Sequence, residues 1–163
     1  MRHIKLVVVL SAVAVAVAPM RARTQEQWPP ETAPASYIPT VGDIMGQTQL
    51  RHFKLGFSGS AGNWELANYE LGQITQSFNA IAKLYPKLGD VDFAQLILNE
   101  SAPSLAAISK AISAKSGRDF EKSFEQLTTA CNSCHVAAHV GFIKIRVPTT
   151  SPFSDQIFPP QSR

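Results

Sequence analysis

The sequence has few cysteines, no apolar run long enough to span a membrane, and none of the common nucleotide-binding or hydrolase motifs. Its 163 residues include two cysteines three positions apart, so no further pair is left for a structural disulfide. The longest apolar run, Leu6 to Ala18, has thirteen residues, whereas a membrane-spanning helix needs about 20. No phosphate-binding loop, dinucleotide fingerprint or hydrolase motif is present. We expect a protein that is not an enzyme.

The start of the chain has the pattern of a secretory signal. Arg2 and Lys5 supply positive charge ahead of the apolar run, and we assign residues 1–22 to the signal. The alternative is an uncleaved anchor, because the residues before Arg23 match the small-residue cleavage pattern poorly. The predicted localisation is the periplasm, with membrane contact expected only if the signal is retained.

The excess of basic residues belongs to this signal. The full chain has 15 Lys and Arg against 12 Asp and Glu, and three of the basic residues, Arg2, Lys5 and Arg21, lie within residues 1–22. The remainder has 15 − 3 = 12 basic residues against 12 acidic ones, a formal charge of zero. Because nucleic-acid-binding domains need a basic surface, we expect no nucleic acid partner.

Composition divides the exported part into an arm, a domain and a tail. Residues 23–40 hold four prolines and no apolar periodicity, which predicts an extended or disordered arm. Residues 41–146 are expected to form one domain, and residues 147–163 a proline-rich tail without regular structure. The tail contains three apolar residues, Phe153, Ile157 and Phe158. They leave open whether the tail packs on the domain or stays free.

Apolar residues recur every three or four positions through the domain, which is the spacing of one helix face. We expect a first helix over 41–57, ended by the glycine-rich run 56–62. A second helix is expected to stop at Pro86 and Gly89. Its apolar stripe is Trp64, Ala67, Leu71, Ile74, Phe78, Ile81 and Tyr85.

Two more helices are expected after a short helical turn at 90–99. Ser101 is predicted as the N-cap of the third helix, with Pro103 in its first turn and Gly117 at its end. The fourth helix begins near Asp119. Its stripe is Phe120, Phe124, Leu127, Cys131, Cys134 and Ala138. With no strand-like alternation and no repeats, the sequence predicts an all-α fold, a four-helix bundle.

The stretch Cys131-Asn132-Ser133-Cys134-His135 is the attachment pattern of a c-type haem. In such sites the two thiols add to the haem vinyl groups as thioethers, and the adjacent imidazole binds the iron as the proximal ligand. Both cysteines lie on the apolar stripe of the fourth helix. We therefore expect one covalent haem c built into the bundle, attached at Cys131 and Cys134 and ligated by His135.

Three other interpretations of the motif remain open. A thioredoxin-like redox pair would need a βαβ setting, which the sequence does not show. A structural zinc site would need four ligands, and Cys131, Cys134, His135 and His139 would supply them. A plain disulfide between the two cysteines would also suit an exported protein.

Four helices with the haem motif near the end of the last one resemble the layout of the cytochrome c′ and c556 family, over about residues 41–140. The stretches Met45 to Leu55 and Asn63 to Glu70 are also similar to uncharacterised exported cytochrome-like proteins. In the family, the first helix supplies the distal side of the haem. The resemblance implies Met45 as the sixth iron ligand, as in the c556 branch, with His52 as the alternative ligand. The c′ branch implies an open distal site instead.

The resemblance implies a periplasmic monohaem cytochrome that transfers electrons and turns over no substrate. The alternative is a protein that binds nitric oxide or carbon monoxide at an open distal site, and a third reading is a zinc-bound or disulfide-linked helical module. Redox proteins are the expected partners of an electron carrier. The oligomeric state is left open, with a homodimer as one of the forms to consider, because related bundles often dimerise through their first two helices.

Overall fold

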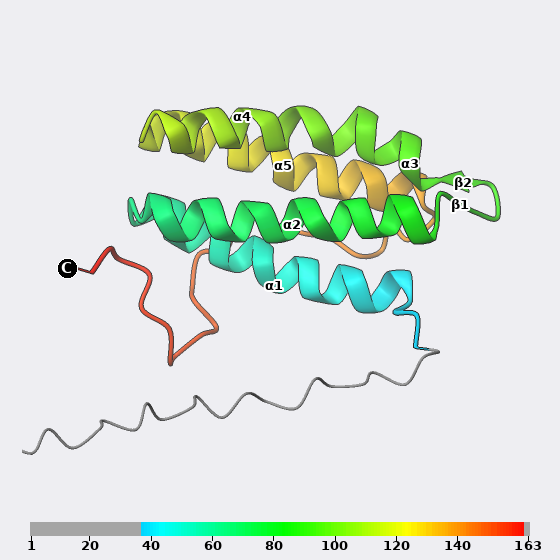
Figure 1. The fold of residues 1–163 in the computed structure, drawn as a ribbon, viewed down its shortest axis with the longest axis horizontal. Helices are drawn as coiled ribbons and strands as arrows, with labels where there is room; N and C mark the ends of the chain where they lie inside the picture. Colours follow the sequence, from blue (N-terminus) through cyan, green and yellow to red (C-terminus); the bar gives the residue numbers. More distant parts are fainter. Residues whose placement is uncertain (1–36, 162–163) are drawn as a thin grey trace, which may run out of the picture. The chain divides into compact units, whose positions relative to one another are not determined.

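The part of the chain that the structure describes folds mainly into α-helices. The computed structural model describes residues 37–161, so the predicted signal (1–22) and most of the predicted arm (23–40) lie outside the described residues. Four long helices follow one another (Figure 1): α1 (Val41–Ser60), α2 (Trp64–Leu84), α4 (Ala102–Ser113) and α5 (Gly117–Ala137). The predicted all-α class is confirmed. Among these residues, no helix is both long and apolar enough to cross a membrane.

Helix α1 starts at a capping box and stops at a glycine. The Thr40 hydroxyl accepts a hydrogen bond from the Asp43 backbone N–H, and the Asp43 carboxylate accepts one from the Thr40 N–H at 2.8 Å. Gly62 has a φ of 71°, in the left-handed region that glycine adopts without strain. Its N–H bonds to the Gly59 carbonyl, which closes the last turn.

The glycine-rich run does end α1, as predicted, but the helix reaches Ser60 and not the predicted residue 57. Gly56 and Gly59 are buried inside the helix, which continues to Ser60. A Cβ on Gly56 would lie 2.8 Å from the Phe124 ring, and one on Gly59 would overlap the Phe120 ring. These two glycines therefore allow the aromatic rings of α5 to approach the α1 backbone closely.

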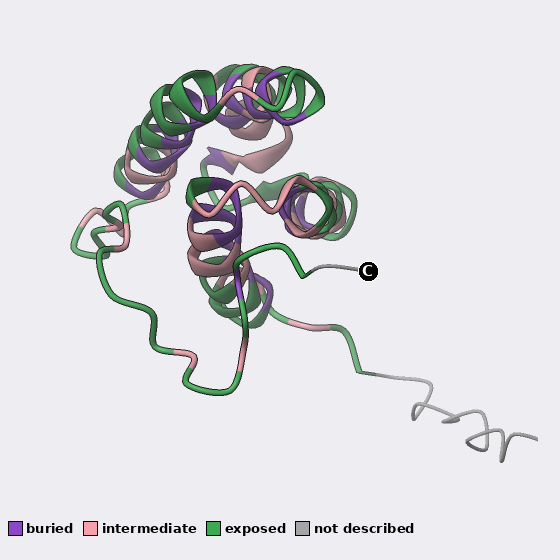
Figure 2. Ribbon diagram, turned by 90° about the vertical axis from the view of Figure 1, so that its left-hand side faces the viewer, coloured by how far each residue is buried: buried purple, intermediate pink, exposed green. Residues whose placement is uncertain are grey.

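A hydrophobic core lies between the long helices. Helix α1 packs along α2, α4 packs along α5, and the buried faces of both pairs point inward (Figure 2). The predicted stripes of α2 and α5 supply most of the core, as their three- and four-residue spacing requires. The core cluster is Leu55, Ala67, Leu71, Ile74, Phe78, Ile108, Ala111, Ile112, Phe120, Phe124 and Leu127.

A small hairpin and one helical turn connect α2 to α4. The elements are β1 (Lys87–Leu88), β2 (Val91–Asp92), α3 (Phe93–Leu96) and the π-helical segment η1 (Ile97–Ser101). The two strands pair antiparallel around Gly89, whose φ is 62°. The helical turn predicted at 90–99 is present as α3 and η1. The two strands were not predicted, because two residues per strand give no readable alternation.

Ser101 stands at the predicted position before α4, with Pro103 in the first turn, but its side chain does not cap the helix. Its backbone is helical, with φ −96° and ψ −38°, and its side chain makes no capping hydrogen bond. Helix α4 instead continues directly from η1, where the Ala102 N–H bonds to the Ile97 carbonyl five residues back. Pro103 has no N–H to complete an α-helical turn, and the wider π turn accommodates this break.

Gly117 was wrongly predicted to end the third long helix, since it is the first residue of α5. Lys115, with a φ of 52°, takes the left-handed position after α4 instead. The N–H groups of Lys115 and Ser116 bond to the carbonyls of Ile112 and Ala111. Backbone carbonyls in the last turn of α4 thus have hydrogen-bond partners without a glycine at the helix end.

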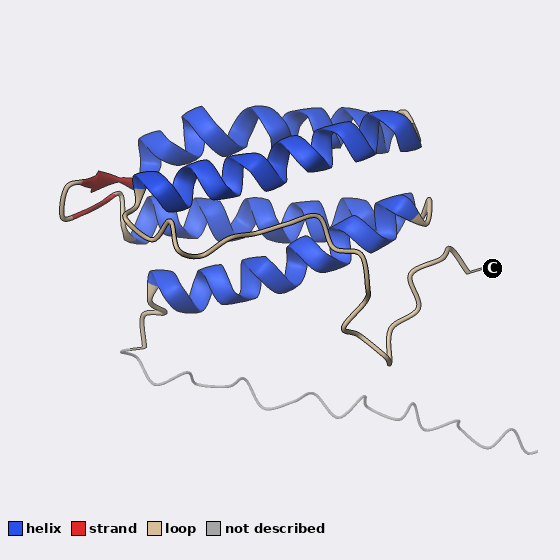
Figure 3. Cartoon of the chain, turned by 180° about the vertical axis from the view of Figure 1, so that it is seen from behind, coloured by secondary structure: helices blue, strands red, loops and turns tan. Residues whose placement is uncertain are grey.

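The segment after α5 packs back on the helices, one of the two outcomes that the sequence left open (Figure 3). Phe153 lies against Phe53 with 6.4 Å between ring centroids, and Phe158 lies against Phe57 at 5.4 Å. Phe158 is buried, whereas Ile157 is exposed. The tail therefore adds an irregular layer along α1.

Candidate functional site

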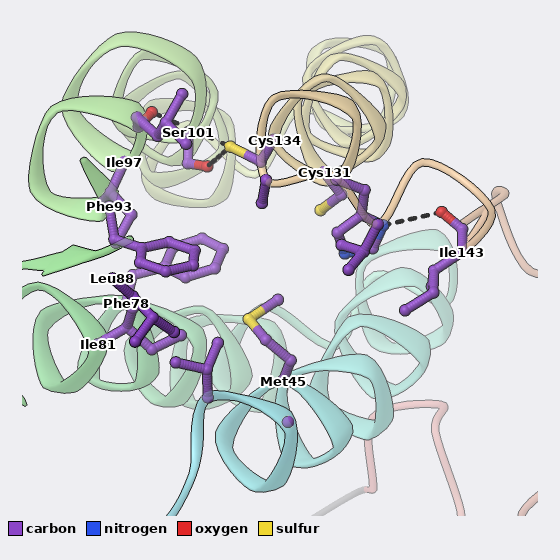
Figure 4. Close-up of a pocket in the computed structure, with 16 residues that line it drawn as sticks. Met45, Phe78, Ile81, Leu88, Phe93, Ile97, Ser101, Cys131, Cys134 and Ile143 are labelled. Atoms are coloured by element: carbon purple, nitrogen blue, oxygen red, sulfur yellow. Dashed lines mark hydrogen bonds between the residues drawn. The ribbon is translucent and has the colours of Figure 1, made fainter. Parts of the chain in front are cut away.

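A cavity of about 330 Å³ lies between α1, α2, α3 and α5, and the turn after α5 forms part of its wall. Its volume falls in the range of ligand pockets, roughly 300–1,000 Å³. Most of its wall is apolar, with aromatic rings from Phe78 and Phe93 (Figure 4). Four residues singled out by the sequence line this one cavity: Met45, Cys131, Cys134 and His135.

The two cysteines face the cavity from the C-terminal part of α5. Both are free and partly buried, so they are not joined in a disulfide. Burial raises the pKa of the Cys131 thiol to about 12, and the neighbouring Cys134 adds to the shift. Burial also raises the pKa of Cys134, although a hydrogen bond with Ser101 opposes this. Thioredoxin-like cysteines need a lowered pKa to react as thiolates, so the environment of these thiols does not favour that chemistry.

The imidazole of His135 is buried and held through one of its two nitrogens. Its Nδ1 lies 2.9 Å from the backbone carbonyl oxygen of Ile143 (Figure 4). A carbonyl oxygen only accepts, so Nδ1 carries the proton and donates it. In the neutral ring, Nε2 is then the unprotonated nitrogen, which is the form that binds a metal. Metal-binding histidines usually donate their other N–H to a carbonyl or carboxylate in this way.

The turn after α5 brings the Ile143 carbonyl back to His135. His139 has a φ of 61° and ends the helix. Its N–H bonds to the Val136 carbonyl, and the Val140 N–H bonds to the His135 carbonyl, the paired bonds of a left-handed helix end. The Ile143 N–H then bonds to the Val140 carbonyl at 2.9 Å, which turns the chain back.

The same turn keeps His139 away from the cysteines. Its Nε2 lies 3.0 Å from the exposed Asp90 carboxylate, and this hydrogen bond lowers the pKa of Asp90. Across residues 37–161, no group of three or more His, Cys, Asp and Glu side chains is placed to hold a metal ion. The zinc site considered for Cys131, Cys134, His135 and His139 is therefore not assembled in this structure.

Met45 reaches the cavity from α1, on the other side from the cysteines. Its side chain is partly buried against the core and points into the cavity across from Cys131 (Figure 4). Met45 also lines a neighbouring cavity of about 240 Å³, as do Cys131 and His135. The structure thus brings together the predicted distal methionine and the haem motif.

His52 lies seven residues after Met45 on α1. It lines only the neighbouring cavity, together with Thr48 and Gln49. Its Nε2 is 2.9 Å from Thr128 Oγ1, and its ring stacks on Phe124 with 4.5 Å between centroids. Burial lowers the pKa of His52 to about 4. The ring is therefore neutral at pH 7 and is held against α5 by Thr128 and Phe124.

Sequence reasoning missed three residues around the site. Ser101 Oγ lies 3.9 Å from Cys134 Sγ, yet the sequence pattern around Ser101 indicated a helix cap. Ile143 contributes only a backbone carbonyl, which every residue has, so no sequence signal could identify it. Asn132 bonds through its side chain to the Ile145 backbone, but it occupies a position of the motif that the haem pattern leaves free.

Comparison of the chain with models of protein families, with curated proteins and with solved structures finds no match. The similarity to cytochromes c′ and c556 therefore remains an expectation from the motif and the helix order.

Proposed function

We propose that this protein is a periplasmic c-type cytochrome that carries electrons on one haem. In this proposal α1, α2, α4 and α5 are a haem-binding four-helix bundle of the cytochrome c′/c556 kind. Cys131 and Cys134 hold haem c as thioethers, and His135 binds its iron. The observation that carries the proposal is the hydrogen bond from His135 Nδ1–H to the Ile143 carbonyl, beside two free cysteines in one apolar cavity.

The two thiols and the His135 imidazole suit a haem better than they suit a thioredoxin-like redox pair, a zinc site or a disulfide. Thioether formation needs two accessible thiols that are not in a disulfide, and both cysteines meet this requirement at the cavity wall. Iron ligation needs an imidazole nitrogen without a proton, and in the neutral ring of His135 the Ile143 contact makes Nε2 that nitrogen. The apolar wall suits the porphyrin face and excludes water. When bound, the haem supplies a one-electron couple at its iron.

The cavity wall offers little for chemistry on a substrate. None of its lining residues is Asp, Glu, Lys or Arg, so general acid–base catalysis would depend on His135, which the proposal assigns to the iron. Met45 brings a soft, neutral thioether to the opposite wall. Ligands from both sides would leave no open position for a substrate. A site of this kind suits electron transfer to redox proteins, because the ligands need not rearrange.

Gas binding is the second candidate function, and the neighbouring cavity favours it. This cavity of about 240 Å³ adjoins Met45, Cys131 and His135, and its wall includes the polar side chains of Thr48 and Gln49. If the Met45 thioether does not bind the iron, a diatomic ligand would have space there, and the Gln49 amide could donate to it. The Thr48 hydroxyl already donates to the Ile44 carbonyl at 2.8 Å. Nitric oxide and carbon monoxide are the ligands to test.

Voltammetry and carbon monoxide binding on one preparation distinguish the two functions. The full chain is exported in a host that attaches haem c, then oxidised and reduced in steps. An electron carrier should show one reversible one-electron couple, and its ferrous form should not bind carbon monoxide within seconds. A high-spin ferric protein that binds the gas on mixing would contradict the carrier and support the second function. A preparation without any redox couple would contradict both.

A further inference from the structure

We infer that Asn132, the first residue between the two cysteines, is a positioning residue for His135. The inference rests on the proposed function, because it takes His135 as the iron ligand. The Asn132 side chain makes two hydrogen bonds to one backbone position: Nδ2 donates to the Ile145 carbonyl and Oδ1 accepts from the Ile145 N–H, both at 2.8 Å. Asn132 thus clamps the chain two residues beyond the carbonyl that holds His135.

The clamp and the histidine contact join the same two pieces of chain. Asn132 and His135 are three residues apart on α5, so they lie on neighbouring parts of one helix surface. Their partners, Ile145 and Ile143, are two residues apart on the segment that follows the turn. Because Asn132 engages both the N–H and the carbonyl of Ile145, a shift of the segment by one residue would break both bonds. The clamp therefore fixes which carbonyl faces the His135 ring.

Side chains of this segment contribute little to holding it in place. Phe142, Lys144 and Arg146 are exposed, and Ile143 is 43% exposed. The next firm contacts lie further along the chain, where Pro148 meets Gly56 and the tail phenylalanines pack on α1. Ile143 is also held by its N–H bond to the Val140 carbonyl and by the His135 contact, and Ile145 is half-buried beside the neighbouring cavity. The two Asn132 hydrogen bonds act with these contacts on residues 143–146, and their loss would loosen this stretch without releasing the rest of the tail.

The restraint matters for the iron through the His135 ring. A hydrogen bond from Nδ1–H to a carbonyl makes the imidazole a stronger donor and fixes its orientation. A stronger donor stabilises the ferric state and lowers the reduction potential. Loosening the Ile143 carbonyl should weaken the bond and raise the potential. Mutations of such outer partners typically cost 10–100-fold in metal affinity or activity.

The test uses Asn132→Ala, Asn132→Asp and a matched control, Asn63→Asp, in the haem-loaded full chain. Asn63 Nδ2 donates to the Phe158 carbonyl at 2.9 Å, at the other end of the tail. The Asp substitution at either site removes one amide donor to a tail carbonyl and adds the same charge. Asn132→Asp keeps an acceptor for the Ile145 N–H, and Asn63→Asp keeps the cap that accepts from the Leu66 N–H.

Two readouts are measured: the reduction potential, and the exchange of the His135 Nδ1 proton with deuterated solvent by NMR. Asn132→Ala should favour the ferrous state about tenfold, a rise of about 59 mV for one electron, and exchange should be at least tenfold faster. The Asp pair is compared by exchange alone, because its added charge shifts the potential directly. Exchange should be faster in Asn132→Asp and unchanged in Asn63→Asp.

The result that overturns the inference is a haem-loaded Asn132→Ala protein with wild-type potential and wild-type exchange. The proposed function would survive that result. Equal exchange in the two Asp variants would also overturn it, since the effect would then belong to the tail as a whole. A wild-type protein that carries no haem would overturn the proposed function itself, and this is visible before any variant is compared.

Discussion

The imidazole Nε2 of His52 on α1 lies 2.9 Å from the hydroxyl of Thr128 on α5. The same hydroxyl lies 2.9 Å from the Phe124 carbonyl. A carbonyl only accepts, so Thr128 donates there and accepts from His52. His52 therefore carries its proton on Nε2 and is neutral, in agreement with the lowering of its pKa to about 4 by burial. This pair connects the first and last helices beside the candidate site.

Stability should fall with acid because of His52. An unfolded histidine binds a proton below pH 6.5, whereas folded His52 resists protonation down to about pH 4. The stabilisation from the neutral ring is thus complete above pH 6.5 and is lost as pH falls toward 4, by up to about 3 kcal/mol. Denaturant unfolding at about pH 7 and about pH 4.5 measures it. His52→Gln should show a smaller loss than wild type, while the exposed control His139→Gln should match wild type. An equal loss in His52→Gln would contradict this account of the ring.

Met45 should control the sixth position of the iron. With its thioether bound, the ferric protein should be low-spin and show the weak near-infrared band of sulfur-to-iron charge transfer. Met45→Leu keeps a similar volume without the sulfur and should abolish the band and allow the ferrous protein to bind carbon monoxide. A wild-type spectrum without the band, together with a high-spin iron in His52→Ala, would identify His52 as the ligand. A wild-type protein that is already high-spin would indicate an open site.

A side chain at Gly59 should lower the stability of the protein. An added Cβ would overlap the Phe120 ring in the core, and overpacking of this kind costs about 1–3 kcal/mol. Gly59→Ala should therefore lower the free energy of unfolding by about that amount in urea. Gly72→Ala on α2 is the matched control, because nothing lies within 4 Å of its added Cβ. It should stabilise the protein by about 0.5–1 kcal/mol. Similar effects of the two substitutions would contradict the close packing of α1 on α5.

A helix could be predicted from the sequence where the pattern that specifies it lies within the helix itself. The stripes of α2 and α5 repeat every three or four residues, and such a repeat requires no knowledge of the partner helix. The end of α1 was misplaced because the role of Gly59 depends on Phe120, which lies about 60 positions later. The N-cap predicted at Ser101 failed for a similar reason, since the π turn before it arises from how Pro103 joins a continuing helix.

The residues of the candidate site also differ in whether the local sequence identifies them. Cys131, Cys134 and His135 could be named because covalent attachment requires fixed residue types at fixed spacing. The contacts that orient them could not, because Ile143 acts through a backbone carbonyl and Asn132 binds a segment thirteen residues away. Met45 was predicted from its position on the first helix. The structure places it on the cavity wall, and only the iron spectrum can show whether it binds.

The most direct test of the central claim is the intact mass of the denatured protein. The full chain should be purified from the periplasm of a host with haem attachment machinery, and the same sample stained for haem on a denaturing gel. We predict a polypeptide heavier by one haem, with a stained band that disappears when Cys131 and Cys134 are both replaced by Ala. A polypeptide mass without added haem, and an unstained band from wild type, would contradict the account.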